Sequence, residues 1–238
     1  MTTALLVPSS TAPRRTALAA SSPDTPFALV GDRLWLDFVN SDDVHRVHGG
    51  PAARRGHADA LSDFELFVRW LERVALLDAE RAAGIRRRAQ QQPAGATAVL
   101  ADARRVRAAL RALAEWAAGE ARRVTEVRAT ALAEINRVLG RSAGMRRLDQ
   151  RSDGTFVRSF APVGDAFASL LIPVVDSAAE SLIVSELRRV RRCADPACAR
   201  VFHDATKNGC RRWCDMTSCG NRAKAARHRL RKHQPPDA

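Results

Sequence analysis

Five cysteines constrain this chain more than any other feature. All of them lie within 27 positions near the C-terminal end, and the first 192 residues contain none. Four of them form two pairs, each with four intervening residues, and fifteen residues separate the pairs, namely Cys193, Cys198, Cys214 and Cys219. Thiolates spaced in this way can converge tetrahedrally at about 2.3 Å from a zinc ion. The sequence therefore predicts one structural zinc site held by these four sulfurs.

Other uses of the cysteines fit less well. A disulfide framework is disfavoured by the odd count, the crowding and the lack of a credible signal peptide. The segment has few apolar residues beyond Val201, Phe202 and Trp213, so a metal would supply stabilisation on the order of 10 kcal/mol. An iron–sulfur cluster and four free cysteines are the remaining alternatives. A closed all-thiolate shell is typical of structural zinc, so we expect no catalytic residues and no enzymatic activity.

Two nearby residues could compete as ligands. Cys210 lies four positions before Cys214 and has no symmetric partner, so we assign it no ligand role. His203 is expected to be an exposed loop histidine rather than a ligand.

The charge is concentrated in the same segment. The chain carries 39 Lys and Arg against 26 Asp and Glu, but Arg-rich composition also reflects a GC-rich bacterial genome. After Leu187 there are 14 basic and 4 acidic residues, and all three lysines of the chain lie there. Such asymmetry predicts a polyanionic partner, usually nucleic acid.

A basic helix is predicted over residues 220–233, after the last cysteine of the cluster. Ala223, Ala226 and Leu230 recur at helical spacing and are expected to rest on the zinc knuckles. The remaining surface offers phosphate contacts and side chains that can read base edges in the major groove. The predicted DNA-binding residues are Asn221, Arg222, Lys224, Arg227, Arg229, Arg231 and Lys232. The alternative is a solvated helix whose arginines reflect codon usage.

The preceding part of the chain predicts a mainly helical domain over residues 27–187. Ser62 and Glu65 form a capping box that starts a helix with a buried apolar stripe, and Asp78 caps a second helix that Pro93 stops. Further helices are expected over 96–119, 125–140 and 164–184, the last kinked or divided by Pro173. Alternation between Met145 and Phe160 around Ser152-Asp153-Gly154 predicts a small β-hairpin.

The apolar stretch from Phe27 to Asn40 predicts a short strand or buried turn before a helix start. Asp37 and Asn40 are short polar residues within it, and we expect them to satisfy backbone amides at a turn. A ligand pocket is the functional alternative for this pair. Trp35, Trp70 and Trp116 are expected in the core.

The whole chain is thus predicted as mainly α with a small β-hairpin. Its predicted divisions are a disordered tail over 1–26, a helical regulatory domain over 27–187, a four-cysteine zinc finger with a knuckle hairpin and basic helix over 188–234, and a tail over 235–238. The longest apolar runs are far shorter than the roughly 20 residues of a membrane helix. We expect a cytoplasmic protein, associated with the nucleoid and with no membrane partner.

Residues Trp213 to Arg222 read WC-x4-CGNR, which resembles the signature of the CGNR zinc finger. The preceding C-x4-C pair, Phe202 and Asp204, and the RRWC that ends at Cys214 fit the same family. The resemblance implies one zinc ion bound by the four paired cysteines, and DNA binding. Cys210 departs from the family pattern and leaves open a redox role.

The upstream part resembles the ABATE domain, which accompanies this finger in bacterial stress-induced transcription regulators. The resemblance rests on LWLDFVN at Leu34 to Asn40, on the helix after Ser62 and on the SAAESLI run, and Ser41 departs from the usual Thr. It implies that the chain regulates transcription. Because a regulator needs an input, we expect the helical domain before the finger to sense a small-molecule effector or to mediate association. An RNA-binding module and a zinc-thiolate redox sensor are the alternatives.

Overall fold

A computed structural model describes residues 27–42, 59–119, 124–141, 144–150, 156–162, 167 and 169–232. Within these ranges the side chains of Val124, of the strands over 144–150 and 156–162, and of residues 230–232 are not described. The predicted tails over 1–26 and 235–238 and the predicted Ser152-Asp153-Gly154 turn lie outside the described residues.

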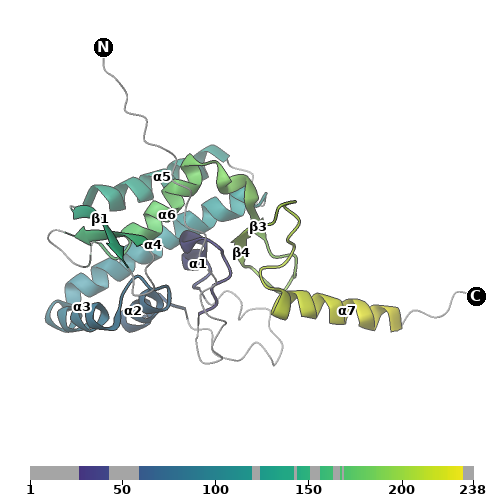
Figure 1. Cartoon of the computed structure of the whole chain (residues 1–238), viewed down its shortest axis with the longest axis horizontal. Coiled ribbons are helices and arrows are strands. Elements are labelled where there is room, and N and C mark those ends of the chain that lie inside the picture. Colours follow the sequence, from purple (N-terminus) through teal and green to yellow (C-terminus); the bar gives the residue numbers. More distant parts are fainter. Residues whose placement is uncertain are drawn as a thin grey trace, which may run out of the picture.

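The described elements are mainly helical, with two short antiparallel strand pairs (Figure 1). The helices are α1 Leu34–Val39, α2 Phe64–Arg73, α3 Ala79–Gln91, α4 Pro93–Ala117, α5 Val124–Arg141, α6 Ile172–Ile183 and α7 Asn221–Lys232. The strands are β1 Gly144–Gln150, β2 Phe156–Pro162, β3 Val190–Arg192 and β4 Val201–His203. Single turns of 3₁₀ helix over Glu186–Arg189 and of π-helix over Met216–Gly220 precede β3 and α7. The predicted fold class is confirmed.

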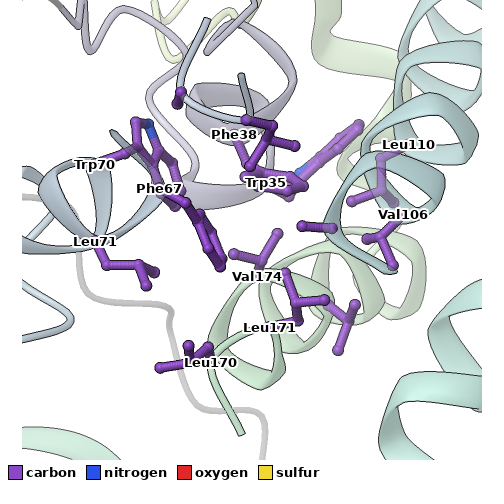
Figure 2. Packing of buried hydrophobic residues seen from close by; sticks show 14 of the residues in the cluster. Trp35, Phe38, Phe67, Trp70, Leu71, Val106, Leu110, Leu170, Leu171 and Val174 are labelled. Carbon is purple, nitrogen blue, oxygen red and sulfur yellow. The ribbon is translucent and has the colours of Figure 1, made fainter. Parts of the chain in front are cut away.

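The long helix α4 organises the core. It contacts α1, α2, α3 and α5, and α1 and α5 also contact α6 (Figure 1). Aromatic rings from α1 and α2 fill the space between these helices, as Figure 2 shows for Trp35, Phe38, Phe67 and Trp70. The indole N–H of Trp35 donates to Ser181 Oγ at 3.0 Å, so burial leaves this polar group satisfied.

The predicted start of α2 is one residue too early. The N-cap is Asp63, whose Oδ1 accepts from Leu66 N–H at 2.8 Å, so the Ser62 capping box is wrong. Ser62 donates its hydroxyl to Asp59 O instead, and the Glu65 carboxylate binds Arg86. Asp and Ser are about equally good N-cap residues, so the adjacent Ser62 and Asp63 left the first residue of the helix ambiguous in the sequence. The predicted cap at Asp78 is confirmed, since its Oδ1 accepts from Arg81 N–H.

Two prolines, Pro93 and Pro173, lie in the first turn of a helix. Pro93 lies in the first turn of α4, which therefore starts before the predicted residue 96. Pro173 lies in the first turn of α6, so the predicted kink is wrong and the helix begins at Ile172 rather than 164. A proline in the first turn costs no intrahelical hydrogen bond, because the N–H it lacks would have had no partner there.

The predicted hairpin is confirmed as an antiparallel pair whose register runs from Gly144 opposite Pro162 to Gln150 opposite Phe156. Of the strand or buried turn predicted near Phe27, no strand forms: residues 27–30 are irregular, residues 31–33 form a bend with Gly31 buried, and α1 follows at Leu34. Among the described helices, none is both long enough and apolar enough to cross a membrane.

Candidate metal centre and nucleic-acid interface

The four paired cysteines come together in space. Cys193 follows β3, Cys198 lies on the loop to β4, Cys214 precedes the π-helical turn and Cys219 lies within it. All four are buried, and their sulfurs lie within 4.8 Å of one another. Cys214 Sγ is 3.8 Å from Cys198 Sγ and 3.7 Å from Cys219 Sγ. Four ligands at about 2.3 Å from a tetrahedral zinc ion stand roughly 3.8 Å apart, so the arrangement fits zinc.

Backbone hydrogen bonds of the loop between β3 and β4 hold the first cysteine pair in place. Cys193 N–H donates to Arg200 O at 2.9 Å, and Cys198 N–H donates to Asp195 O at 2.9 Å. Asp195 Oδ1 also accepts from Ala197 N–H at 3.0 Å. The compact turn that results places both sulfurs on one side of the loop.

Without a cation the four sulfurs compete for protons. Hydrogen bonding from Cys198 lowers the pKa of the Cys193 thiol, whereas hydrogen bonding with Cys193 raises the pKa of the Cys214 thiol. The protein alone therefore stabilises one sulfur as thiolate and another as thiol. A bound divalent cation removes this conflict, because metal binding favours the deprotonated form of every ligand.

The two potential competitors lie outside the cluster. His203 is 4% exposed in β4, which corrects the expectation of an exposed loop histidine. Its Nε2 lies 3.8 Å from Glu186 Oε2, and burial lowers its pKa. Because both faces of β4 are covered, all three of its residues are buried. Cys210 is exposed and is not among the four clustered sulfurs.

The CGNR motif, residues 219–222, supplies one cysteine of the metal centre and several contacts around it. A Cβ on Gly220 would lie 2.7 Å from Met216 Sδ, so a larger residue requires the flexible Met216 side chain to move. Asn221 Nδ2 donates to Thr217 O at 3.0 Å. Arg222 donates from Nε to Asp195 Oδ2 at 2.6 Å and from Nη2 to Cys219 Sγ at 3.2 Å. Its guanidinium thus connects the two cysteine knuckles and offsets the negative charge of the thiolates.

The remaining predicted DNA contacts lie along α7, which extends away from the rest of the protein in Figure 1. Lys224, Arg227 and Arg229 are exposed. None of the three forms an ion pair with a carboxylate of a described residue. The side chains of Arg231 and Lys232 are outside the described part.

One expectation about α7 is wrong. Ala226 is exposed and Ala223 is only half-buried, so this face does not rest on the zinc knuckles. The helix instead contacts the π-helical turn Met216–Gly220 that precedes it. The Leu230 side chain is not described.

Asp37 and Asn40 connect the N-terminal domain to the finger. Asn40 Nδ2 donates to Val201 O at 2.7 Å, and Asn40 Oδ1 accepts from Val201 N–H at 3.0 Å. Asp37 Oδ1 accepts from Gly31 N–H at 2.8 Å, and Gly31 O accepts from His203 N–H at 2.9 Å. These side chains satisfy backbone groups, but the groups belong partly to β4 and not only to a local turn.

Other contacts at this junction were missed by the sequence analysis. Within the N-terminal domain, Arg33 binds the carboxylate of Glu186, close to the start of the finger, with two hydrogen bonds of 2.8 and 2.7 Å. Arg211 forms an ion pair with Asp32 and stacks 4.4 Å from the Phe202 ring centroid. Val190 and Val201 belong to the main hydrophobic core rather than to a separate one. The RRWC motif contained Arg211, but its partner lies 179 positions away and no local pattern reveals it.

Comparison with protein families finds two matches. The ABATE model, described as "Putative stress-induced transcription regulator", matches residues 32–186. The model of the CGNR zinc finger matches residues 189–232. Comparison with curated proteins found no match. The first match covers more than half of the chain, and the second coincides with the cluster of four sulfurs. The chain therefore belongs to the ABATE family and carries a CGNR zinc finger with one structural zinc.

Proposed function

We propose that this protein is a zinc-dependent transcription regulator whose finger binds duplex DNA through α7, with Cys193, Cys198, Cys214 and Cys219 as the zinc ligands. The observation that carries the proposal is an exposed helix on which Lys224, Arg227 and Arg229 form no ion pair with a described residue. Cations on an unpartnered helix are available to phosphate and base groups.

The dimensions of α7 suit the major groove. Its 12 residues span about 18 Å, and an α-helix of ordinary diameter enters the groove of B-form DNA. Lys224 and Arg227 are three positions apart and therefore lie on one side of the helix. We assign them to the DNA backbone or base edges, together with Arg229, Arg231 and Lys232. If all five neutralise phosphates, log K should fall against log salt with a slope of about −4 to −5.

Arg222 and Asn221 receive a different role. Their described contacts are with the zinc centre and with the turn before α7, so they hold the helix in position rather than read DNA. The zinc ion would supply the stability that the short finger lacks, and the finger would supply binding rather than catalysis. The N-terminal domain senses a ligand or mediates association, and the protein acts in a bacterial cytoplasm near the nucleoid.

A pair of matched double variants tests the proposal. Lys224→Ala/Arg227→Ala should lower duplex affinity and reduce the salt slope by about 2, one for each phosphate contact removed. Arg81→Ala/Arg87→Ala removes two exposed cations from α3 and should leave both quantities unchanged. Fluorescence anisotropy on zinc-loaded protein measures both. Equal losses in the two variants would show nonspecific attraction by net charge and would refute the assignment to α7.

An RNA target and redox sensing are the competing functions. A structured RNA that competes better than duplex DNA would favour the first. Zinc release at low peroxide that disappears in Cys210→Ser would favour the second, because Cys210 is the exposed thiol near the cluster.

A further inference from the structure

Two neighbouring arginines, Arg211 and Arg212, lie just before the second cysteine pair and have different partners. Arg211 is half-buried, forms an ion pair with Asp32 and donates from Nε to Trp213 O at 3.0 Å. Arg212 is exposed, and its guanidinium carbon lies 5.2 Å from the centroid of the Trp213 ring. The described part of the chain gives the Arg212 guanidinium no ion pair and no hydrogen bond. Contacts within the protein thus account for the charge of Arg211 but not for that of Arg212.

The indole of Trp213 restrains the Arg212 side chain. Trp213 is half-buried and packs against the buried cysteine cluster, so packing holds its ring in place. A cation within about 6 Å of an indole centroid is attracted to the ring, and this attraction lowers the entropy that the long side chain loses when it binds a partner. The N–H donors of a guanidinium form a planar fork that matches the oxygens of a phosphate. Arg212 is therefore an exposed and restrained cation that suits an oxyanion.

Backbone contacts place Arg212 close to the start of α7. The Arg212 carbonyl accepts from Ala194 N–H at 2.8 Å, and the next residue along the chain, Asp195, accepts from Arg222 Nε at 2.6 Å. Arg222 lies in the first turn of α7. Two neighbouring residues of one cysteine knuckle therefore bind the backbone of Arg212 and the first turn of α7. Asp195 is buried and its carboxylate is paired with Arg222, so it does not neutralise Arg212.

A duplex that takes up α7 brings phosphates to this position. The major groove is about 12 Å wide and an α-helix is about 10 Å across, so a helix inside the groove has a sugar–phosphate backbone close on each side. A cation that lies beside the start of the helix, but not on it, meets phosphates rather than base edges. Such contacts fix the position and orientation of a protein on DNA.

We propose that Arg212, supported by Trp213, binds a phosphate of the DNA backbone that borders the groove occupied by α7. The proposal rests on the function proposed above and adds a contact that lies outside α7. Because phosphates are the same in every sequence, this contact contributes equally to duplexes of different sequence.

Fluorescence anisotropy of zinc-loaded full-length protein with a labelled duplex, over a salt series, tests the proposal. Arg212→Ala should weaken binding about tenfold and make the salt slope shallower by about 1, equally for duplexes of different sequence. Arg81→Ala also removes one exposed cation, but from α3, which lies on the opposite side of the protein from α7 in Figure 1. This control should leave affinity and slope unchanged. Zinc content and Tm should equal those of the wild type in both variants.

Two further variants separate the charge of Arg212 from the ring that supports it. Arg212→Lys keeps the charge but loses the planar fork, so affinity should fall about threefold while the slope stays the same. Trp213→Leu keeps an apolar side chain against the cysteines but removes the aromatic face, and it should also weaken binding about threefold at an unchanged slope. If Trp213→Leu loses zinc, the two Arg212 variants decide the question, because they leave the packing around the sulfurs intact.

A salt slope that is the same in Arg212→Ala as in the wild type would overturn the proposal and leave Arg212 as a surface residue beside Trp213. Equal losses in Arg212→Ala and Arg81→Ala would overturn it as well, because they would reflect net charge alone. Neither result affects the assignment of DNA binding to α7, which the Lys224→Ala/Arg227→Ala variant measures. Absence of duplex binding by the wild type would instead refute the function proposed above, and this contact with it.

Discussion

The pair of hydrogen bonds between Asn40 and Val201 predicts that the N-terminal domain and the finger unfold together. Asn40 is 5% exposed and Val201 is fully buried, so water cannot replace a lost partner without a local rearrangement. Replacing Asn40 by Ala removes both hydrogen bonds and leaves the N–H and C=O of Val201 unpaired.

The magnitude follows from those two groups. Each buried unsatisfied group costs about 1–3 kcal/mol, so Asn40→Ala should lower the free energy of unfolding by about 2–6 kcal/mol. For a chain of this size each kcal/mol corresponds to about 2–4 °C, which predicts a fall in Tm of roughly 4–24 °C. Differential scanning calorimetry of zinc-loaded protein measures this fall.

The same variant should also release zinc more quickly. Val201 adjoins Arg200, whose carbonyl accepts from the N–H of Cys193, so movement of β4 disturbs a zinc ligand. A chelator that changes absorbance on binding zinc follows the release. Asn136→Ala provides the control, because Asn136 is exposed on α5 and its loss should change stability by less than about 0.5 kcal/mol. A variant at Asn40 that melts with the wild type and releases zinc at the same rate would refute the reasoning.

Three further predictions concern the finger and its junction. Cys214→Ser should abolish stoichiometric zinc and DNA binding, measured by metal analysis and anisotropy; retained zinc would exclude it as a ligand. Arg222→Ala should speed zinc release about tenfold while Lys224→Ala leaves it unchanged, and equal rates would remove Arg222 from the zinc centre. The hydrogen bonds from Arg33 lower the pKa of the Glu186 carboxyl. The contribution of this ion pair to stability is therefore fully present above about pH 4.3, and it is lost as the pH falls through the lowered pKa. Urea midpoints of Glu186→Gln should accordingly depend less on pH below 4.3, and identical profiles would contradict this.

Local sequence signals predicted the elements whose stabilising contacts lie close in sequence. The cysteine spacing identified the cluster, and the buried apolar stripe predicted for the helix after Ser62 is present in α2, where Phe67 and Trp70 are fully buried. The cap at Asp78 also depends only on an amide three residues away. In each case the physical partner lies within the motif or on the same helix face.

The errors concern partners that lie far away in sequence. The residues around His203 have the composition of a loop. In the structure α1 covers β4, so His203 is buried together with the rest of that strand. The side chain of Asn40 finds its partner 161 positions later, which no local pattern reveals. Ala226 belongs to a set of apolar residues at helical spacing, which suggested a buried face. Because α7 extends away from the body of the protein, no other element covers Ala226, and it is exposed.

Duplex DNA binding by zinc-loaded protein over a salt series tests the central claim most directly, with a chelated sample and an RNA competitor measured alongside. The account predicts binding that requires zinc, prefers duplex DNA over RNA, and weakens with salt at a slope of about −4 to −5. Stoichiometric zinc combined with weak, zinc-independent or RNA-preferring binding would contradict it.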